Sequence, residues 1–553
     1  MLNSVGIKQI RRKGWLYLNV FFRCRPNEGR VCKMIKYPVG IQSFEKIRKE
    51  NYLYIDKTGY IYDLVRNYQY VFLSRPRRFG KSLLTSTLEC YFRGKKDLFS
   101  GLAIGSLETE WNQYPVLHFS LDTAALGTCE DTEDEIGLQL SEMEHEYGMP
   151  DGGRNITVRF QKLVVGLFNK TGRQVVVLID EYDVPVLSVR DDERREDMRA
   201  LMKSFYSPIK RLDRYLRFVF ITGITKFSQL SIFSQINNLE AISMDPSFAT
   251  ICGITAAELE KHFSEGISAM AEKFNITSSD ILDRLRKKYD GYHFAQGSSG
   301  VYNPFSLLSS MKKCSFANYW FETGTPHFLI SQLKKFHTDI TQIDGSQADA
   351  REFDAPTDDM HSILPLLYQS GYLTIKDYDR SSLMYTLGYP NEEVKLGLTE
   401  VLIPYYVWSD INQSDHACWA ISNALICDDI DKALKAAQKY FSSIPYQEGT
   451  LRDAPSTEGH FTAMLYVMFS FLNKFVYSQV RVAKGRMDIL VMTSKTVFVM
   501  ELKLNGSVDE ALRQIDDRSY SIPWQSEGRR VVKVGINFST KERTIEKWKS
   551  AEA

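Results

Sequence analysis

Apolar runs alternate with amphipathic stretches between Tyr52 and about Gly223, and this alternation predicts a parallel α/β sheet. The runs that read as strands are 70–74, 116–121, 175–180 and 218–224. The last two lack the polar and apolar alternation of a half-exposed strand, which is typical of strands covered on both faces. Helices are expected from Lys81 to Tyr91 and in the acidic stretch after the second strand.

Beyond Thr255 the pattern becomes mostly helical, first over 256–274 and then on to about Leu308. Residues 362–375 predict a helix, and 383–398 predict a hairpin that turns at Gly-Tyr-Pro-Asn. Together they resemble a winged helix, which reads DNA in some proteins and packs against protein in others. Residues 410–450 are again helical.

The last hundred residues predict a separate α/β unit. A helix is expected over 458–472 and another from Val508 to Tyr520. The strands are expected near the ranges 476–482, 487–492, 496–503 and 531–538.

Composition limits the function classes. The chain has 553 residues and a net charge of +1, so several domains are expected and any basic surface must be local. The eight cysteines form no CxxC pair, which favours reduced thiols over zinc ligands. No apolar run approaches the ~18 residues that span a bilayer. The sequence therefore predicts a cytoplasmic protein with no membrane partner.

Residues 1–33 differ from the rest because they carry eight Lys or Arg residues and one acid, Glu28. Ordered patterning starts only after Met34. We interpret 1–33 as an extension outside the core, with Met34 as the functional start. The alternative is a basic arm that contacts nucleic acid.

A phosphate-binding motif follows the first strand in the segment SRPRRFGKSLL. The pattern GxxxxGK[ST] is met at Gly80, Lys81 and Ser82, whereas Arg75 stands at the first glycine position. Backbone N–H groups at the start of the following helix, Leu83 included, are expected to face the phosphates. Lys81 would bridge the β- and γ-phosphates of ATP, and the Ser82 hydroxyl would bind Mg²⁺.

A second motif lies in VVVLIDEYD, an apolar strand that ends in Asp180 and Glu181. In an ATPase the first carboxylate holds Mg²⁺ and the second orients the attacking water. The alternative is a core strand that ends in a solvated acidic turn. After the strand FVFITGI, Thr222 and Lys226 are candidates for sensing the γ-phosphate, or they are ordinary loop residues. Arg211, Arg214 and Arg217 are candidates for an arginine finger by proximity alone.

The segments YPVGIQSFEKIRKENYLYIDKT, RPRRFGKSLL, LIDEYDVPV and FITGITKFSQLSIFSQINNL resemble the bacterial AAA-ATPase-like proteins related to archaeal ATPases. The likeness runs from about Met34 to Leu239. It implies an ATP-binding P-loop domain whose loop commonly reads RPRRFGKS, so that Arg75 is a family feature.

The third candidate site lies in GRMDILVMTSKTVFVMELK. Glu501 and Lys503 are two residues apart on one strand and so share a face, and a hairpin would bring Asp488 to the same point. Such a cluster suits metal-assisted phosphodiester hydrolysis, with Mg²⁺ held by Asp488 and Glu501. Lys503 would position water or stabilise the developing charge. The alternative is an ion pair at the end of a surface hairpin.

This pattern resembles the PD-(D/E)xK nuclease superfamily over about 455–540. The resemblance implies further roles for Glu458 on the first core helix and for Gln514 on the helix after the ExK strand. Glu458 would otherwise cap its helix near Thr457, and Gln514 would be a solvated helix residue. Met487 replaces the proline of the motif name.

The sequence thus predicts an α/β multidomain chain. We expect an extension (1–33), a P-loop NTPase domain with a parallel sheet (34–250), a helical and winged-helix-like middle (251–400), a helical linker (401–455) and a PD-(D/E)xK-like domain (456–553). The expected function is an ATP-controlled, Mg²⁺-dependent nuclease acting on DNA, with RNA as the other substrate and the oligomeric state unassigned. The rival is an ATP-dependent regulatory or scaffolding switch whose nuclease-like domain only binds.

Overall fold

The computed structural model describes residues 35–122, 127–189, 191–225, 239–321, 332–333, 336, 340–353, 362–406, 411–443, 458–470, 476–482 and 484–553. The chain divides into two units, Met1–Lys36 and Tyr37–Ala553, and every described helix and strand belongs to the second. The expected extension over 1–33 and the candidate Lys226 lie outside the described residues. None of the described helices is both long and apolar enough to cross a bilayer.

The first sheet has five parallel strands in the order β2-β3-β4-β1-β5. They are β1 (Tyr70–Ser74), β2 (Val116–Ser120), β3 (Val175–Asp180), β4 (Leu216–Gly223) and β5 (Glu240–Ala241). The predicted α/β class with a parallel sheet is confirmed, and the short strand β5 was not anticipated. Strand β4 lies between β1 and β3, although it follows both of them along the chain.

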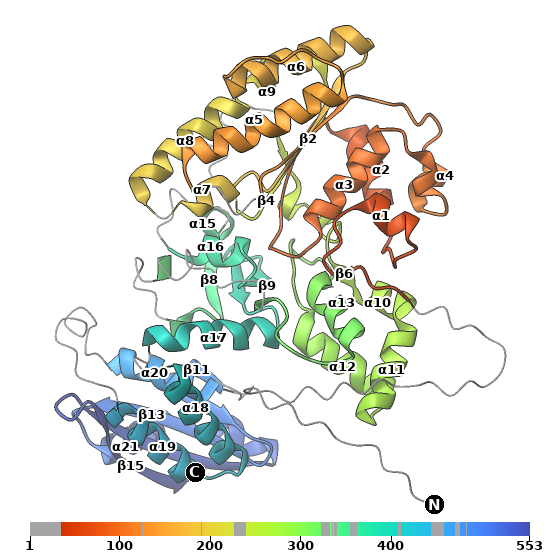
Figure 1. Cartoon of the computed structure of the whole chain (residues 1–553). Helices are drawn as coiled ribbons and strands as arrows, with labels where there is room; N and C mark the ends of the chain where they lie inside the picture. The colour runs from red at the N-terminus through yellow and green to blue at the C-terminus, as the bar shows by residue number, and fades with distance from the viewer. Residues whose placement is uncertain are drawn as a thin grey trace, which may run out of the picture. The chain divides into compact units, whose positions relative to one another are not determined.

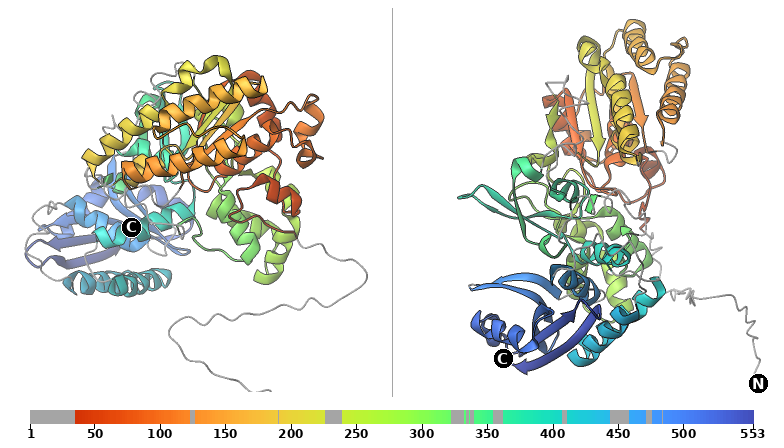
Figure 2. Two further views of the ribbon diagram at one scale, coloured as in Figure 1. Left: turned by 45° about the horizontal axis from the view of Figure 1, so that its top comes forward. Right: turned by 90° about the vertical axis from the view of Figure 1, so that its left-hand side faces the viewer.

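Helices cover both faces of this sheet because its strands are apolar on both sides (Figure 1). One face packs against α1, α2 and α3, and the other against α5, α6 and α8, which lie together across the sheet in Figure 2. The bounds of these helices are α1 (Phe44–Lys49), α2 (Thr58–Asn67), α3 (Lys81–Phe92), α5 (Cys129–Glu146), α6 (Ile156–Thr171) and α8 (Asp192–Tyr206). Shorter helices are α4 (Ala103–Leu107), α7 (Val184–Ser188) and α9 (Pro208–Arg211).

A helical group with its own apolar core follows. It comprises α10 (Ala256–His262), α11 (Ser264–Phe274), α12 (Ser278–Tyr289) and α13 (Pro304–Lys313), with a small antiparallel pair of β6 (Ile254–Thr255) and β7 (Val301–Tyr302). Capping boxes start two of the helices, Thr255 with Glu258 and Thr277 with Asp280. The predicted helical character of this region is confirmed.

The predicted hairpin exists, but its turn was placed wrongly. Strands β9 (Thr374–Asp379) and β10 (Met384–Gly388) turn between Asp379 and Met384, and β8 (Ser346–Asp349) pairs with β10. The Gly-Tyr-Pro-Asn segment instead leads into helix α17 (Glu392–Tyr406), because the Asn391 side chain accepts a hydrogen bond from Val394 N–H and caps the helix. Helix α16 (Leu364–Gln369) precedes the hairpin, and α15 (Ala350–Phe353) follows β8.

The C-terminal part is a five-stranded sheet in sequence order, β11-β12-β13-β14-β15. Only β13 and β14 are parallel, and α21 crosses between them. Helices α20 and α21 pack on opposite faces. The bounds are α18 (Ile411–Ile426), α19 (Ile430–Ser443), α20 (Glu458–Ser470), β11 (Val476–Val482), β12 (Gly485–Met492), β13 (Thr496–Leu504), α21 (Val508–Asp517), β14 (Arg530–Ser539) and β15 (Thr544–Glu552). The four predicted strands are confirmed, and β15 was missed.

Candidate nucleotide and nuclease sites

The loop between β1 and α3 has the backbone of a phosphate cradle. Arg78 and Gly80 both have positive φ, +67° and +89°, and α3 starts directly afterwards at Lys81. A left-handed conformation at Gly80 favours glycine, since any side chain there would be strained. The first turn of α3, which contains Ser82 and Leu83, therefore directs its unpaired N–H groups toward the loop.

Lys81 is held inside this loop. Its side chain is buried, and Nζ donates to the carbonyl oxygens of Arg75 (3.1 Å) and Pro76 (3.2 Å). The same ammonium lies 3.4 Å from Oε1 of Glu181, at the end of β3. The structure thus brings together the lysine and the second carboxylate that the sequence assigned to nucleotide binding and hydrolysis.

Asp180 and Thr222 meet at the carboxyl ends of β3 and β4, on the face that α3 covers. Both side chains are buried, and among the described residues neither Asp180 Oδ1 nor Thr222 Oγ1 has a hydrogen-bond partner. Burial raises the pKa of Asp180, and the nearby Ser82 hydroxyl partly offsets that rise. Hard oxygen atoms left without a protein partner beside Lys81 fit Mg²⁺ and a phosphate oxygen.

A cavity of about 540 Å³ opens onto these residues. Gly80, Lys81, Ser82, Leu83 and Glu181 line its floor. The segment around Gly40 and the start of α13 line it as well. A volume of this size is within the range of small-molecule sites.

The second site forms where β12 and β13 pair. The two strands are antiparallel, and their register sets Ile489 opposite Met500. The next pair in this register is Asp488 opposite Glu501. Asp488 Oδ2 accepts a hydrogen bond from Leu502 N–H (2.9 Å). Lys503 Nζ lies 3.5 Å from Glu501 Oε1, and Gln514 of α21 donates to the same oxygen. Four of the five predicted residues therefore come together.

Glu501 is 2% exposed although it carries a carboxylate. The neighbour of Glu501 on β14 is Gly535, which has no side chain, and helix α21 can therefore approach Glu501 closely. A Cβ atom at position 535 would lie 2.4 Å from the Val508 carbonyl oxygen at the start of α21. Glu458 is the first residue of α20, but its side chain lies outside the described part of the structure. Within that part, no group of three or more His, Cys, Asp or Glu side chains could hold a metal ion.

Comparison with known proteins agrees with this geometry. Residues 38–233 match a family described as predicted AAA-ATPase, and residues 456–548 match the PD-(D/E)XK nuclease superfamily. The chain is 32% identical over 523 residues to an uncharacterized protein in the vnfD 5' region of Azotobacter chroococcum mcd 1, an alignment that covers 92% of this chain and 98% of that protein. The chain belongs to the AAA-ATPase-like family. It thus joins an ATPase-like domain to a nuclease-superfamily domain.

The Arg75 side chain points away from the phosphate loop of this AAA-ATPase-like protein. Its buried guanidinium donates to the carbonyl oxygens of Ser243 and Phe248 and lies 4.2 Å from the ring centre of Phe294. Its backbone N–H donates to Gly223. Its carbonyl oxygen accepts a hydrogen bond from Lys81 Nζ. Among the described contacts, Arg75 therefore reaches the expected nucleotide-binding residues through its backbone and not through its guanidinium.

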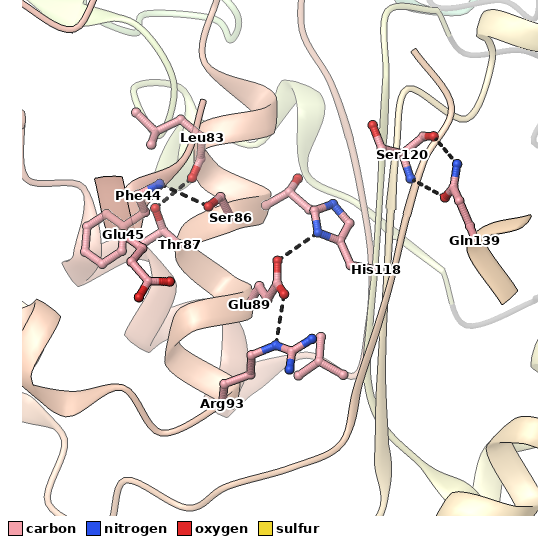
Figure 3. A network of polar contacts seen from close by, with 12 residues as sticks. Phe44, Glu45, Leu83, Ser86, Thr87, Glu89, Arg93, His118, Ser120 and Gln139 are labelled. Atoms are coloured by element: carbon pink, nitrogen blue, oxygen red, sulfur yellow. Dashed lines mark hydrogen bonds and ion pairs between the residues drawn. The ribbon is translucent and has the colours of Figure 1, made fainter. Parts of the chain in front are cut away.

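His118 carries a further polar side chain in this region that no sequence motif predicted. It lies on β2 with its side chain on the same sheet face as Asp180, and Nδ1 is 2.9 Å from Glu89 Oε2. The other carboxylate oxygen of Glu89, Oε1, accepts a hydrogen bond from Arg93 (Figure 3). His118 Nε2 is buried and has no hydrogen-bond partner among the residues described. A polar residue inside an otherwise apolar strand is the signal that would have found it.

Asp183, which no sequence motif singled out, links the end of β3 to the segment after β4. Its fully buried carboxylate accepts hydrogen bonds from the N–H groups of Ile224 and Thr225 and from the Thr225 hydroxyl. Burial, followed by the charge of Glu181, raises the pKa of Asp183 to about 6.

The three arginine-finger candidates lie at the wrong end of β4 to act within their own chain. Arg217 is near the first residue of β4 and donates to the Val65 carbonyl oxygen, and Arg214 stacks on Tyr215. Arg211 precedes them at the end of α9. Thr222 is at the opposite, carboxyl end of the strand.

Proposed function

We propose that the protein is an ATP-controlled, Mg²⁺-dependent nuclease that acts on DNA. The observation that carries the proposal is the cluster of Asp488, Glu501, Lys503 and Gln514. A carboxylate as buried as Glu501 is costly unless cationic partners or hydrogen bonds compensate its charge. Lys503 and Gln514 supply part of that compensation, and both act on one oxygen atom of Glu501.

In this nuclease Asp488 and Glu501 would hold Mg²⁺, which supplies Lewis-acid polarisation of the phosphodiester and an acidified water when bound. Gln514 fixes the orientation of the Glu501 carboxylate. Lys503 stands beside the same carboxylate and would stabilise the negative charge that develops on the phosphate. The low exposure of Glu501 keeps these charges in a medium where each contact is stronger than in water.

In the ATPase-like domain, Lys81 would neutralise the β- and γ-phosphates, while Ser82 and Asp180 would hold Mg²⁺. Thr222 would contact the γ-phosphate from the strand between the two motifs. Glu181 would orient the attacking water, since its carboxylate faces both Lys81 and the cavity.

Glu181→Gln is expected to leave ATP binding intact and to slow ATP hydrolysis about 100-fold or more, because the amide lacks the negative charge that orients the attacking water. Single-turnover hydrolysis and the nucleotide retained on the protein measure both effects. Glu142→Gln removes an exposed carboxylate of α5 and is the matched control. A wild-type protein without ATPase activity under every condition, DNA included, would make the domain a binder and contradict this role.

A continuous set of contacts supports ATP control of the second site. The Trp320 indole N–H donates to the Arg77 carbonyl oxygen (3.2 Å) in the phosphate loop. The Trp320 backbone N–H donates to Glu393 at the start of α17 (2.9 Å), and burial raises the pKa of Glu393 to about 7. On the same helix, Lys395 donates to the carbonyl oxygen of Val476, the first residue of β11 (2.9 Å).

Trp320→Phe is expected to remove the dependence of DNA cleavage on nucleotide, because a phenyl ring keeps an aromatic group there but lacks the indole N–H that donates to the loop. Cleavage rates with ATP, with a non-hydrolysable analogue and without nucleotide would be compared in variant and wild type. Trp111→Phe loses an equivalent indole bond, to the Glu108 carbonyl oxygen, and serves as the control. An unchanged nucleotide response in the Trp320 variant would rule out this route.

The rival function is an ATP-dependent switch or scaffold whose nuclease-like domain only binds. It is favoured by the internal pairing of Glu501 with Lys503 and Gln514, which satisfies one carboxylate oxygen without a metal. Incubation of plasmid, linear DNA and RNA with and without Mg²⁺ and ATP separates the two functions. If none of these substrates is cleaved, the ATP-dependent switch is the function that remains.

A further inference from the structure

Helices α18 and α19 form an antiparallel pair that frames a groove of about 790 Å³. Helix α19 is fixed to the C-terminal sheet, since Gln438 donates to the Ile545 carbonyl oxygen (2.7 Å) and Asp431 accepts from the Trp548 indole (2.8 Å). The groove is thus a surface of the part of the chain that carries the nuclease-like cluster.

One wall of the groove is basic. Lys432, Lys435 and Lys439 line it, and their spacing of three and four residues places them on one face of α19. All three are exposed. Lys432 pairs with Asp429 (2.7 Å), whereas in the described part of the chain no carboxylate lies within ion-pair distance of Lys435 or Lys439. The wall therefore has excess positive charge on a chain whose net charge is +1.

The other wall presents an aromatic ring. Trp419 of α18 lines the groove and is 60% exposed, although tryptophan is highly buried on average. Exposed aromatic rings beside a positive track are the combination with which proteins hold unpaired bases and their phosphates.

We propose that this groove binds a single strand of nucleic acid, with phosphates along the three lysines and a base stacked on Trp419. Lys432 and Lys439 are about 10 Å apart along the helix axis, so the three ammonium groups follow a length of backbone rather than one phosphate. A paired base does not offer its face to a side chain, so the ring selects for unpaired strands. The inference rests on the proposed nuclease function and adds that the substrate is delivered as a single strand.

The test uses the full chain with Asp488→Asn in EDTA, so that binding is measured without cleavage. The probe is a fluorescent oligothymidylate of about 16 nucleotides, read by anisotropy at several salt concentrations. Lys432→Glu with Lys435→Glu and Lys439→Glu is expected to weaken binding at least tenfold and to lower the slope of log K against log salt by about 2. Trp419→Ala should weaken binding at least fivefold, and Trp419→Phe should restore most of it.

The matched control reverses three exposed lysines on other helices, Lys261→Glu, Lys287→Glu and Lys312→Glu, and so changes net charge equally. Equal melting temperatures verify that both triple variants fold. A loss of binding as large in the control would overturn the proposal, because net charge alone would explain it. Equal affinity for duplex DNA, together with no effect of Trp419→Ala, would also overturn it. So would displacement of the probe by polyglutamate as effectively as by unlabelled strand, because that result would indicate an acidic protein partner.

Comparable binding of oligouridylate supports the inference, since phosphate and base stacking are common to RNA and DNA. If the wild-type protein cleaves nothing but binds the strand through the groove, the proposed nuclease function is refuted and the strand-binding groove is kept. If the protein cleaves and the groove substitutions leave the cleavage rate unchanged, the strand-binding groove is refuted and the nuclease function is kept.

Discussion

Asp488→Asn is expected to abolish Mn²⁺ binding and nucleic-acid cleavage while the chain stays folded. The amide oxygen still accepts the hydrogen bond from Leu502 N–H, so the pairing of β12 with β13 is preserved. The substitution replaces one of two adjacent carboxylates by a neutral amide, and a hard divalent cation such as Mn²⁺ depends on charged oxygen ligands. Calorimetric titration with Mn²⁺ and a plasmid-nicking assay provide the readouts.

Two further substitutions separate the roles within this cluster. Glu501→Gln should also remove metal binding, whereas Lys503→Ala should keep the metal and slow cleavage about 100-fold, the size of one lost transition-state contact. Asp516→Asn, which removes a half-exposed carboxylate paired with Lys533, is the control and should change neither. If wild type and Asp488→Asn bind Mn²⁺ with the same weak affinity, the domain has a nuclease-like fold without nuclease chemistry.

Lys81→Ala is expected to weaken ATP binding by about 10-fold to 150-fold, the range for loss of a hydrogen bond to a charged group. Stability should change little, since Lys81 and Glu181 both line the open cavity and water there can replace the lost ammonium beside Glu181. Calorimetry with ATP and a thermal melt measure the two quantities.

Lys96→Ala, at an exposed position just past α3, is the control and should leave ATP affinity unchanged. Equal ATP affinity in wild type and the Lys81 variant would contradict the assignment of the loop as the nucleotide site.

Most strands of the two five-stranded sheets could be predicted, and the clearest of them are buried on both faces and so have an uninterrupted apolar run, such as 175–180. Strand β15 was missed because it is a polar edge strand, TIEKWKSAE, whose sequence resembles a loop. The Gly-Tyr-Pro-Asn error has a similar origin. A proline after a strand fits a turn, but here the residue after it, Asn391, caps a helix. Asparagine is common both in turns and at helix N-caps, so the residue type alone does not distinguish the two.

The site residues that a motif places within a few positions, such as Lys81 and Ser82 or Glu501 and Lys503, were accessible to sequence reasoning. His118 and Trp320 were not, since their partners Glu89 and Arg77 are 29 and 243 residues away. The place of the Arg75 guanidinium was not accessible either: its position in the motif suggested phosphate, whereas its contact with Phe294, far along the chain, sets where the guanidinium lies.

The anchoring of the phosphate loop has a thermodynamic consequence. Arg75 packs on Phe294, Phe79 packs between Tyr292 and Phe294, and Arg77 accepts from Trp320, so the loop is ordered by the same contacts that fold the region after it. Ligand affinity and local folding are then two aspects of one equilibrium. If the loop holds the proposed nucleotide, binding would stabilise the region from Tyr292 to Trp320 by mass action, and a substitution that loosens this region would lower nucleotide affinity without contacting the nucleotide.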